Sequence, residues 1–348
     1  MRNISRRILC LLFAAAILLP WMAASGGAVH GAAEAEESPV IAWNLVLDGN
    51  IGMNFVLNLT EEQAATASIA YTVNGETTTR QLNGATTFTV DLAAAQMTDQ
   101  VTLVLTTDTD TFTKTYSGIG YAESILYGDY DVTAKNLVRY LLTYCAASQK
   151  YFDYHTDYLA DYDVTVDALA VPAEGAACTV TGQQEGVAFY GASLVHRNKI
   201  AVRFYFHADS TDGLTFSHPY TQDGNLYYME IADICPQDLD QNIEVSVGDV
   251  TVRYCPMDYI IRMYAKGGST ADLVQALYGY HIAAKGYTAF TGMTYEKFIA
   301  LPSAERREFQ ESFDDLSLFF QWYEEAKRKY EEENPPIIVG GDGTVVIP

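Results

Sequence analysis

The sequence predicts a mixed α+β fold rich in β-strands, with two repeated antiparallel β-sandwich-like modules, each closed by an amphipathic helix, and a helical C-terminal tail. Two internal matches predict the repeat. Residues 44–57 align without gaps onto residues 193–206. Residues 137–151 align onto residues 273–287. Because the two matches occur in the same order along the chain, an internal repeat is favoured over the alternative, a chance similarity.

The first match has the pattern of half-buried strands, in which apolar residues alternate with others along the chain. In the first copy these residues are Leu45, Leu47, Ile51, Met53, Phe55 and Leu57. In the second copy they are Leu194, Ile200, Val202, Phe204 and Phe206. Asp48-Gly49 is a hairpin-turn signal, and its counterpart is Arg197-Asn198. Each copy of the match therefore predicts a hairpin.

The second match has the spacing of an amphipathic helix. One stripe consists of Leu137, Leu141, Tyr144, Ser148 and Tyr151, and the other of Leu273, Leu277, Tyr280, Ala284 and Tyr287. Ser269 and Asp272 supply capping and first-turn signals for the second helix. His281 takes the position of Cys145, and we interpret it as a structural residue.

Residues between the matched ends are typical of strands, being rich in Thr, Val, Tyr and Phe. In the first copy the predicted strands are Ser68–Val73, Thr77–Leu82, Thr87–Leu92, Val101–Thr106 and Thr111–Tyr116, with an Asn74-Gly75 hairpin turn. In the second copy they are Leu226–Ile231, Ile243–Val247 and Val250–Tyr254. Short helices are predicted at Tyr121–Tyr127 and Asp258–Tyr264.

The predicted organisation has five parts: a signal peptide at 1–33, a first module at 39–152, an ordered linker at 153–185, a second module at 186–291 and a tail at 292–348. The tail is expected to hold helices at Met293–Leu301, Ser303–Ser312 and Asp315–Glu333, separated by Pro302 and Phe313-Asp314. After Pro335-Pro336 a small hairpin or edge strand is expected.

The N-terminus predicts export. Arg2, Arg6 and Arg7 precede an apolar run from Ile8 to Met22, and small residues follow. We expect cleavage after Ala28 or after Ala33, an uncleaved anchor being the alternative, and no membrane-spanning segment in the mature chain. The formal net charge is −23, and loss of the three arginines makes it more negative. Such a charge disfavours nucleic acids as partners.

No recognisable catalytic motif is present, whether H-E-x-x-H, a serine-hydrolase elbow or a phosphate-binding glycine loop. No catalytic residue and no cofactor is therefore predicted. Asp238, Asp240 and Asn242 have the opening spacing of a calcium loop, but the sixth position is Ile243 where that loop needs glycine, so a polar turn is the alternative.

The remaining candidates are cysteines and aromatic residues. The mature chain would hold Cys145, Cys178, Cys235 and Cys255, which we interpret mainly as buried small residues, with a Cys235–Cys255 disulfide as the alternative. Trp43, Trp322 and exposed tyrosines have the chemistry to stack on sugar rings, although most such aromatics lie in cores.

Two segments carry a resemblance to a known group of proteins. They are LVRYLLTYCAASQKYFDYHTDYLAD and TYEKFIALPSAERREFQESFDDLSLFFQWYEEAKRKYEEENPPIIVGGDGTVVI. The first resembles a recurrent LLNYGAYAQKYFGYNTDNLAN-type segment, and both resemble uncharacterised secreted or cell-surface modular proteins of Gram-positive gut anaerobes, especially Clostridia. The resemblance covers most of residues 40–348. It implies location and architecture, and it supplies no catalytic or ligand residues.

The sequence therefore predicts a secreted or cell-surface, non-catalytic interaction protein, adhesin-like or structural, whose partner is an extracellular protein or glycan. The alternative is an extracellular polysaccharide-binding or polysaccharide-active protein. An exposed aromatic row near a pair of carboxylates in a cleft favours that alternative.

Overall fold

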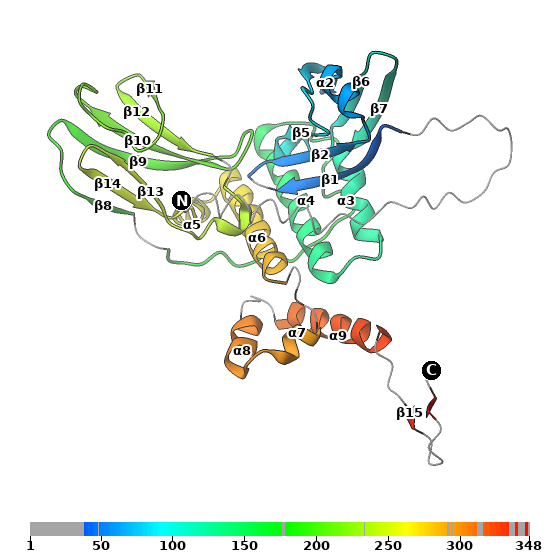
Figure 1. Ribbon diagram of the computed structural model, residues 1–348. Helices are drawn as coiled ribbons and strands as arrows, with labels where there is room; N and C mark the ends of the chain where they lie inside the picture. The colour runs from blue at the N-terminus through cyan, green and yellow to red at the C-terminus, as the bar shows by residue number, and fades with distance from the viewer. Residues whose placement is uncertain are drawn as a thin grey trace.

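The computed structural model describes residues 38–47, 49–175, 178–232, 234–290, 293, 295–311, 316–333, 338–339 and 345–346. The predicted signal peptide and Asp48 of the first turn lie outside these residues. Within them, fourteen strands form four antiparallel sheets, two more strands form a ribbon, and eight α-helices accompany them (Figure 1). The predicted mixed α+β class is confirmed.

The part of the chain from β1 to α4, residues 40–152, is called the first unit and contains two antiparallel sheets. One has the order β1-β2-β5 and consists of β1 (Val40–Leu47), β2 (Ile51–Leu57) and β5 (Thr87–Leu92). The other has the order β4-β3-β6-β7 and consists of β4 (Glu76–Gln81), β3 (Ser68–Val73), β6 (Gln100–Thr106) and β7 (Thr111–Ser117). Helix α2 (Glu61–Thr66) lies between β2 and β3, and the 3₁₀ helix η1 (Ala94–Gln96) lies between β5 and β6.

Aromatic rings connect the layers of the first unit. Phe55 of β2 meets Tyr116 of β7 edge to face, with ring centroids 4.9 Å apart. Trp43 of β1 contacts the same Tyr116 and also Tyr121, which lies in α3 (Gly118–Tyr127). Helix α4 (Val132–Phe152) follows, and its N-cap Asp131 accepts hydrogen bonds from the backbone of Thr133 and Ala134. Both sheets and both helices thus share one core.

The part of the chain from β8 to α6, residues 179–290, is called the second unit and has a similar order of elements. One sheet has the order β11-β12-β10-β9, from β11 (Tyr220–Asp223), β12 (Leu226–Ile231), β10 (Ala201–Ala208) and β9 (Val187–Val195). The other has the order β13-β14-β8, from β13 (Ile243–Val247), β14 (Val250–Tyr254) and β8 (Thr179–Thr181). The 3₁₀ helix η2 (Pro236–Asp238) precedes β13, and α5 (Pro256–Lys266) and α6 (Ser269–Phe290) follow β14.

The aligned hairpins have the same register. Leu45 lies opposite Met53 in the first unit, and Leu194 lies opposite Val202 in the second. Both pairs are related by the offset of 149 residues that the sequence match has. Because a slip of one residue would move every side chain to the other face, this shared register keeps the same positions in both cores.

Helices α4 and α6 pack against each other between the two sets of sheets, as Figure 1 shows. The predicted helical stripes face this core: nine of the ten residues are buried, and Tyr151, 39 % exposed, is the exception. In the middle of the contact, Tyr144 and Tyr280 stack with ring centroids 5.7 Å apart and planes 17° apart. These two residues are aligned in the second sequence match.

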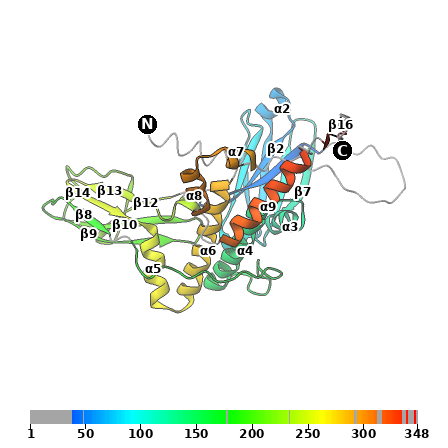
Figure 2. The same cartoon turned by 90° about the horizontal axis from the view of Figure 1, so that it is seen from below.

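The tail packs on the first unit. It contains α7 (Tyr295–Ala300), α8 (Ser303–Glu311) and α9 (Leu316–Glu333), and Figure 2 shows α9 lying over α4. The backbone N–H of Val132 donates to Glu325 of α9 at 3.3 Å. Strands β15 (Ile338–Val339) and β16 (Val345–Val346) pair antiparallel at the end of the chain.

The predicted strands, both short helices, both long helices and the three tail helices are all present, with ends that differ by a few residues. Five described elements were not predicted. They are α2, the 3₁₀ helices η1 and η2, β8, which lies in the predicted linker and pairs with β14, and β11, which pairs with β12. In the described part of the chain, no helix is both long enough and apolar enough to cross a membrane.

Candidate functional site

The predicted calcium residues lie in and after η2. Asp238 ends this 3₁₀ helix, and the carboxylate of Asp240 accepts a hydrogen bond from Lys285 of α6 at 2.7 Å. Asn242 directly precedes β13. Among the described residues, no group of three or more His, Cys, Asp or Glu side chains is placed to hold a metal ion. The calcium site stays a prediction.

Most of the other predicted candidates lie in cores. Cys145, Cys235 and Cys255 are buried, as interpreted, whereas Cys178 is exposed, and no disulfide forms among these four described cysteines. Trp322 is buried among Phe298 and Phe309 of the tail. Trp43 packs in the first unit. Trp322 is buried and Trp43 is partly buried against the core of the first unit, where most such aromatics were expected to lie. Stacking of a sugar on these rings or on exposed tyrosines stays a prediction.

A groove of about 470 Å³ opens on the surface of the first unit. Three segments form it: the β3–β4 turn, the start of β6 and the loop after α4. Its lining residues are Thr72, Asn74, Gly75, Thr98, Asp99, Gln100, Thr102, His155, Asp157 and Tyr158. All of them except the glycine carry hydrogen-bonding side chains. The groove is thus lined by side chains that can form hydrogen bonds, together with the phenol ring of Tyr158.

Gln149, in the last turns of α4, holds the loop that forms one wall of the groove. Its side chain is fully buried. Its amide nitrogen donates to the Oγ1 atom of Thr98 at 3.1 Å and to the carbonyl oxygen of Tyr158 at 3.0 Å. Its amide oxygen accepts from the backbone of Ala160 at 2.8 Å. Because these three bonds use one buried amide, the loop is tied to both α4 and the start of β6.

Asp99 is the buried acid of the groove, with a residue exposure of 7 %. The hydroxyl of Tyr154 donates to its Oδ2 atom at 2.6 Å, and the Nε2 atom of His155 lies 3.7 Å from its Oδ1 atom. Burial raises the pKa of Asp99 above its ordinary value of 3.8, and Tyr154 and His155 act in the opposite direction. The side chain is consequently held in place by the residues around it.

The backbone at the groove has left-handed conformations at positions that are not glycine. Asn74 has φ 47°, Asp153 has φ 52° and His155 has φ 47°. Asn74 and Gly75 together make the predicted hairpin turn, in which both central residues have positive φ. Asp153 ends α4, and its backbone N–H donates to the carbonyl of Gln149. The turn and the helix end place the walls of the groove.

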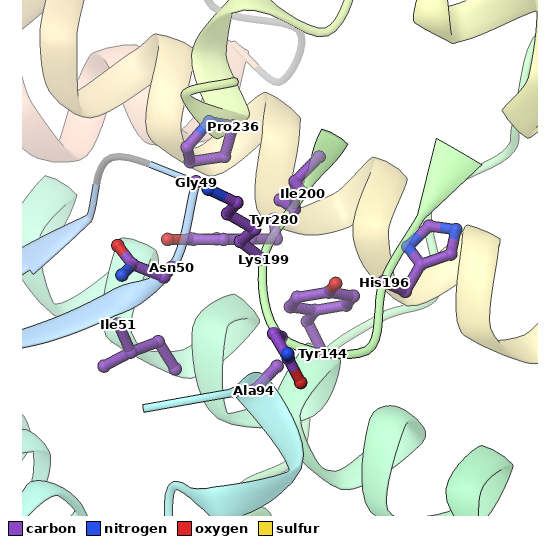
Figure 3. Close-up of a pocket in the computed structure, with 11 residues that line it drawn as sticks. Gly49, Asn50, Ile51, Ala94, Tyr144, His196, Lys199, Ile200, Pro236 and Tyr280 are labelled. Carbon is purple, nitrogen blue, oxygen red and sulfur yellow. The ribbon is translucent and has the colours of Figure 1, made fainter. Parts of the chain in front are cut away.

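A second, much smaller cavity of about 10 Å³ lies where the two units meet (Figure 3). Its residues come in aligned pairs. They are Gly49 with Asn198, Asn50 with Lys199, Ile51 with Ile200, Ala94 with Pro236 and Tyr144 with Tyr280. Ala94 and Pro236 each begin a 3₁₀ helix. The backbone N–H of Ile200 donates to the carbonyl of Gly49 at 2.6 Å. Residues at aligned positions of the two units therefore line one small cavity.

His196 also lines this contact and has no aligned partner there, since the aligned residue is Leu47. It is 8 % exposed, and neither ring nitrogen has a hydrogen-bond partner. Burial lowers its pKa from 6.5 to about 4. The imidazole is therefore neutral at pH 7 and occupies a position that holds an apolar side chain in the first unit.

No protein-family model matches the chain, and no curated protein matches it either.

Sequence reasoning missed the groove residues Asp99, His155 and Tyr158. They are separated by a strand pair and a long helix, so no spacing motif connects them. One signal was present, because Gln149 is a polar residue next to the apolar stripe of α4, at the turn where Ser148 also lies. A buried amide at that position needs partners and predicts a neighbouring loop.

Proposed function

We propose that the protein is an exported, non-catalytic interaction protein built from two copies of one β-sandwich-like unit, which pair about an approximate two-fold axis. The order β1-β2-β5-η1-β6-β7-α3-α4 in the first copy corresponds to β9-β10-β12-η2-β13-β14-α5-α6 in the second. Strands β3 and β4 are extra in the first copy, and β8 and β11 are extra in the second.

The observation that carries the proposal is the contact between the units. In a two-fold arrangement, residue i of one copy meets residue j of the other while j meets i, so residues on the axis meet their own counterparts. Tyr144 stacking on Tyr280 fits this rule. The five aligned pairs around the central cavity fit it as well.

A pair of polar positions supports the same correspondence. Gln149 binds Thr98 in the first unit, and the aligned Lys285 binds Asp240 in the second, where Asp240 follows η2 as Thr98 follows η1. The amide–hydroxyl pair of the first unit therefore corresponds to an ammonium–carboxylate pair in the second. Both partners differ while the contact is kept, which indicates a common scaffold.

The residues that the copies share thus serve the cores and the contact between units. The loops and the extra strands differ between the copies, and we propose that they make the interaction with partners. Together with the predicted signal peptide and the acidic composition, this supports a binding role outside the cell.

The test has two parts. Mass spectrometry of the medium and surface fractions of the producing cells should find an N-terminus at Val29 or Glu34. The purified exported chain should bind at least one member of an array of matrix proteins, mucins and glycans. An intact N-terminus confined to the cytosol contradicts export, and absence of binding across the array contradicts the interaction role.

A specific observation favours the second candidate, polysaccharide binding. The groove of the first unit places two carboxylates, Asp99 and Asp157, beside the exposed ring of Tyr158.

A further inference from the structure

The groove of the first unit has the chemistry of a site for a hydroxyl-rich ligand. Hydroxyl, amide, carboxylate and imidazole groups line it, and these groups donate to and accept from sugar hydroxyls. Its volume of about 470 Å³ falls in the range of small-molecule sites. All of its lining residues except Gly75 carry a side chain that can form hydrogen bonds with such a ligand.

Three side chains of the groove remain available. Within the described residues, the side chains of the groove residues Asn74, Gln100 and Asp157 make no hydrogen bond to another part of the chain. The other polar groups are partly engaged: Thr72 bonds to Thr77 at 2.8 Å, and Thr102 bonds to Thr115 at 2.9 Å. The available groups come from three different segments, so they surround the opening.

Tyr158 supplies the aromatic surface. It is 46 % exposed, and its ring centroid lies 5.5 Å from that of Tyr162 in the same loop. Its backbone is fixed at both polar atoms, because the N–H donates to His155 and the carbonyl accepts from Gln149. Because its backbone is held in place, only the side-chain torsions of Tyr158 are left to be fixed when a flat ligand stacks on its ring.

The charge of the groove limits which ligands fit. Its carboxylates are those of Asp99 and Asp157, and its described lining includes no lysine or arginine. Phosphates, sulfates and acidic sugars would meet these carboxylates without a compensating cation. A ligand rich in hydroxyls and without negative charge is favoured.

We infer that this groove, between the β3–β4 turn, the start of β6 and the loop after α4, binds a neutral oligosaccharide. The inference rests on the proposed extracellular role, for which it names the ligand class and the site. The tyrosine stacks on a sugar ring, while Asn74, Gln100 and Asp157 bond to its hydroxyls.

Isothermal titration of the chain without residues 1–33 tests the inference. The probes are maltohexaose, cellohexaose, mannohexaose and xylohexaose, with trigalacturonate and an oligolysine peptide as charged comparators. We expect at least one neutral hexasaccharide to bind and trigalacturonate not to bind. Preferential binding of oligolysine, or no binding of any neutral probe, overturns the inference.

Variants locate the binding. Tyr158→Ala should lower the affinity about 10-fold or more, and Tyr158→Phe, which keeps the ring, should stay within about 3-fold of the original protein. Tyr190→Ala is the matched control, because Tyr190 is 75 % exposed on β9 of the second unit. Equal losses in Tyr158→Ala and Tyr190→Ala, or no loss in either, overturn the assignment to this groove.

The two proposals fail separately. If the chain is exported and binds a matrix protein but no neutral sugar, the groove inference fails and the interaction role stands. If the sugar binds through Tyr158 while the chain stays in the cytosol, the inference about the groove stands and export fails. Circular dichroism of each variant shows whether a lost affinity reflects a lost fold.

Discussion

In the two-copy scaffold that we propose, the two units have different polar residues at aligned positions. At position 149 a buried glutamine ties a loop to the scaffold, and a groove forms beside it. At the aligned position 285 a half-exposed lysine forms an ion pair with Asp240. The apolar residues of the two helices are the same in kind and face the same core. Aligned packing positions thus hold residues of the same kind, whereas the aligned polar positions 149 and 285 differ and give each unit different surroundings at this place.

The largest effect is expected at the contact between the units. Tyr144→Ala and Tyr280→Ala each remove a ring that is 3 % exposed, and each should lower the free energy of unfolding by about 3–5 kcal/mol. A double-mutant cycle by urea unfolding should give a coupling of about 0.5–1.5 kcal/mol, as stacked rings do. If the losses in free energy of unfolding differ by more than about 2 kcal/mol between the two single variants, the proposed two-fold arrangement is contradicted.

His196 gives the next largest effect, and it depends on pH. Its pKa is lowered from 6.5 to about 4, so its contribution to stability is fully present above pH 6.5 and is lost as the pH falls toward 4. His196→Leu installs the residue type that the first unit has at the aligned position. Its stability relative to the original protein should rise by about 3 kcal/mol between pH 7 and pH 4.

Urea unfolding at both pH values measures this difference. His207→Leu is the control, because the side chain of His207 is 46 % exposed. The difference in stability between this variant and the original protein should change little between pH 7 and pH 4. A difference for His196→Leu that stays constant with pH would show that the imidazole is not buried as described.

A smaller effect of opposite sign is expected at Asp99, whose aligned residue in the second unit is Gln241. Since burial raises its pKa above 3.8, its contribution to stability is full below pH 3.8 and is lost as the pH rises through the raised pKa. Asp99→Asn keeps an acceptor for Tyr154 and removes the titration. The free energy of unfolding of the original protein, relative to that of Asp99→Asn, should therefore rise as the pH falls from 7 to 3. A fall in this difference would contradict the raised pKa.

The smallest effect is expected from exchanging polar partners between units. Asp240→Thr with Lys285→Gln places the contact of the first unit in the second. Both charged side chains are partly exposed, at 44 % for Lys285 and 31 % for Asp240, so the double variant should change stability by about 1 kcal/mol or less. Salt at 0.5 M should weaken the original pair and leave the exchanged pair unchanged. A cost above about 3 kcal/mol would show that the two positions are not equivalent.

Regular patterns made much of the fold predictable. The hairpin strands of the first match have apolar alternation, strands such as Thr87–Leu92 and Leu226–Ile231 are rich in β-branched and aromatic residues, and the Asn74-Gly75 turn has the residues that its positive φ angles need. The long helices showed one apolar stripe each. These elements follow from local chemistry, which a single sequence contains.

The elements that were missed depend on partners elsewhere in the chain. Strand β8 has three exposed residues and exists because β14 offers it an edge. Helix α2 is an exception, since Thr60 and Gln63 form a capping box that the sequence does show. The groove depends on tertiary structure, because Asp99 and His155 lie far apart in the sequence and come within 3.7 Å only in the fold.

Amide hydrogen exchange of the chain without residues 1–33, with and without a saturating neutral hexasaccharide, tests the proposed groove and the two-unit comparison most directly. It compares both units in one experiment. We predict added protection at residues 72–75, 98–102 and 153–158 of the first unit and unchanged exchange at the aligned residues 240–244 of the second. Added protection at 240–244, or none at the groove, would contradict the account.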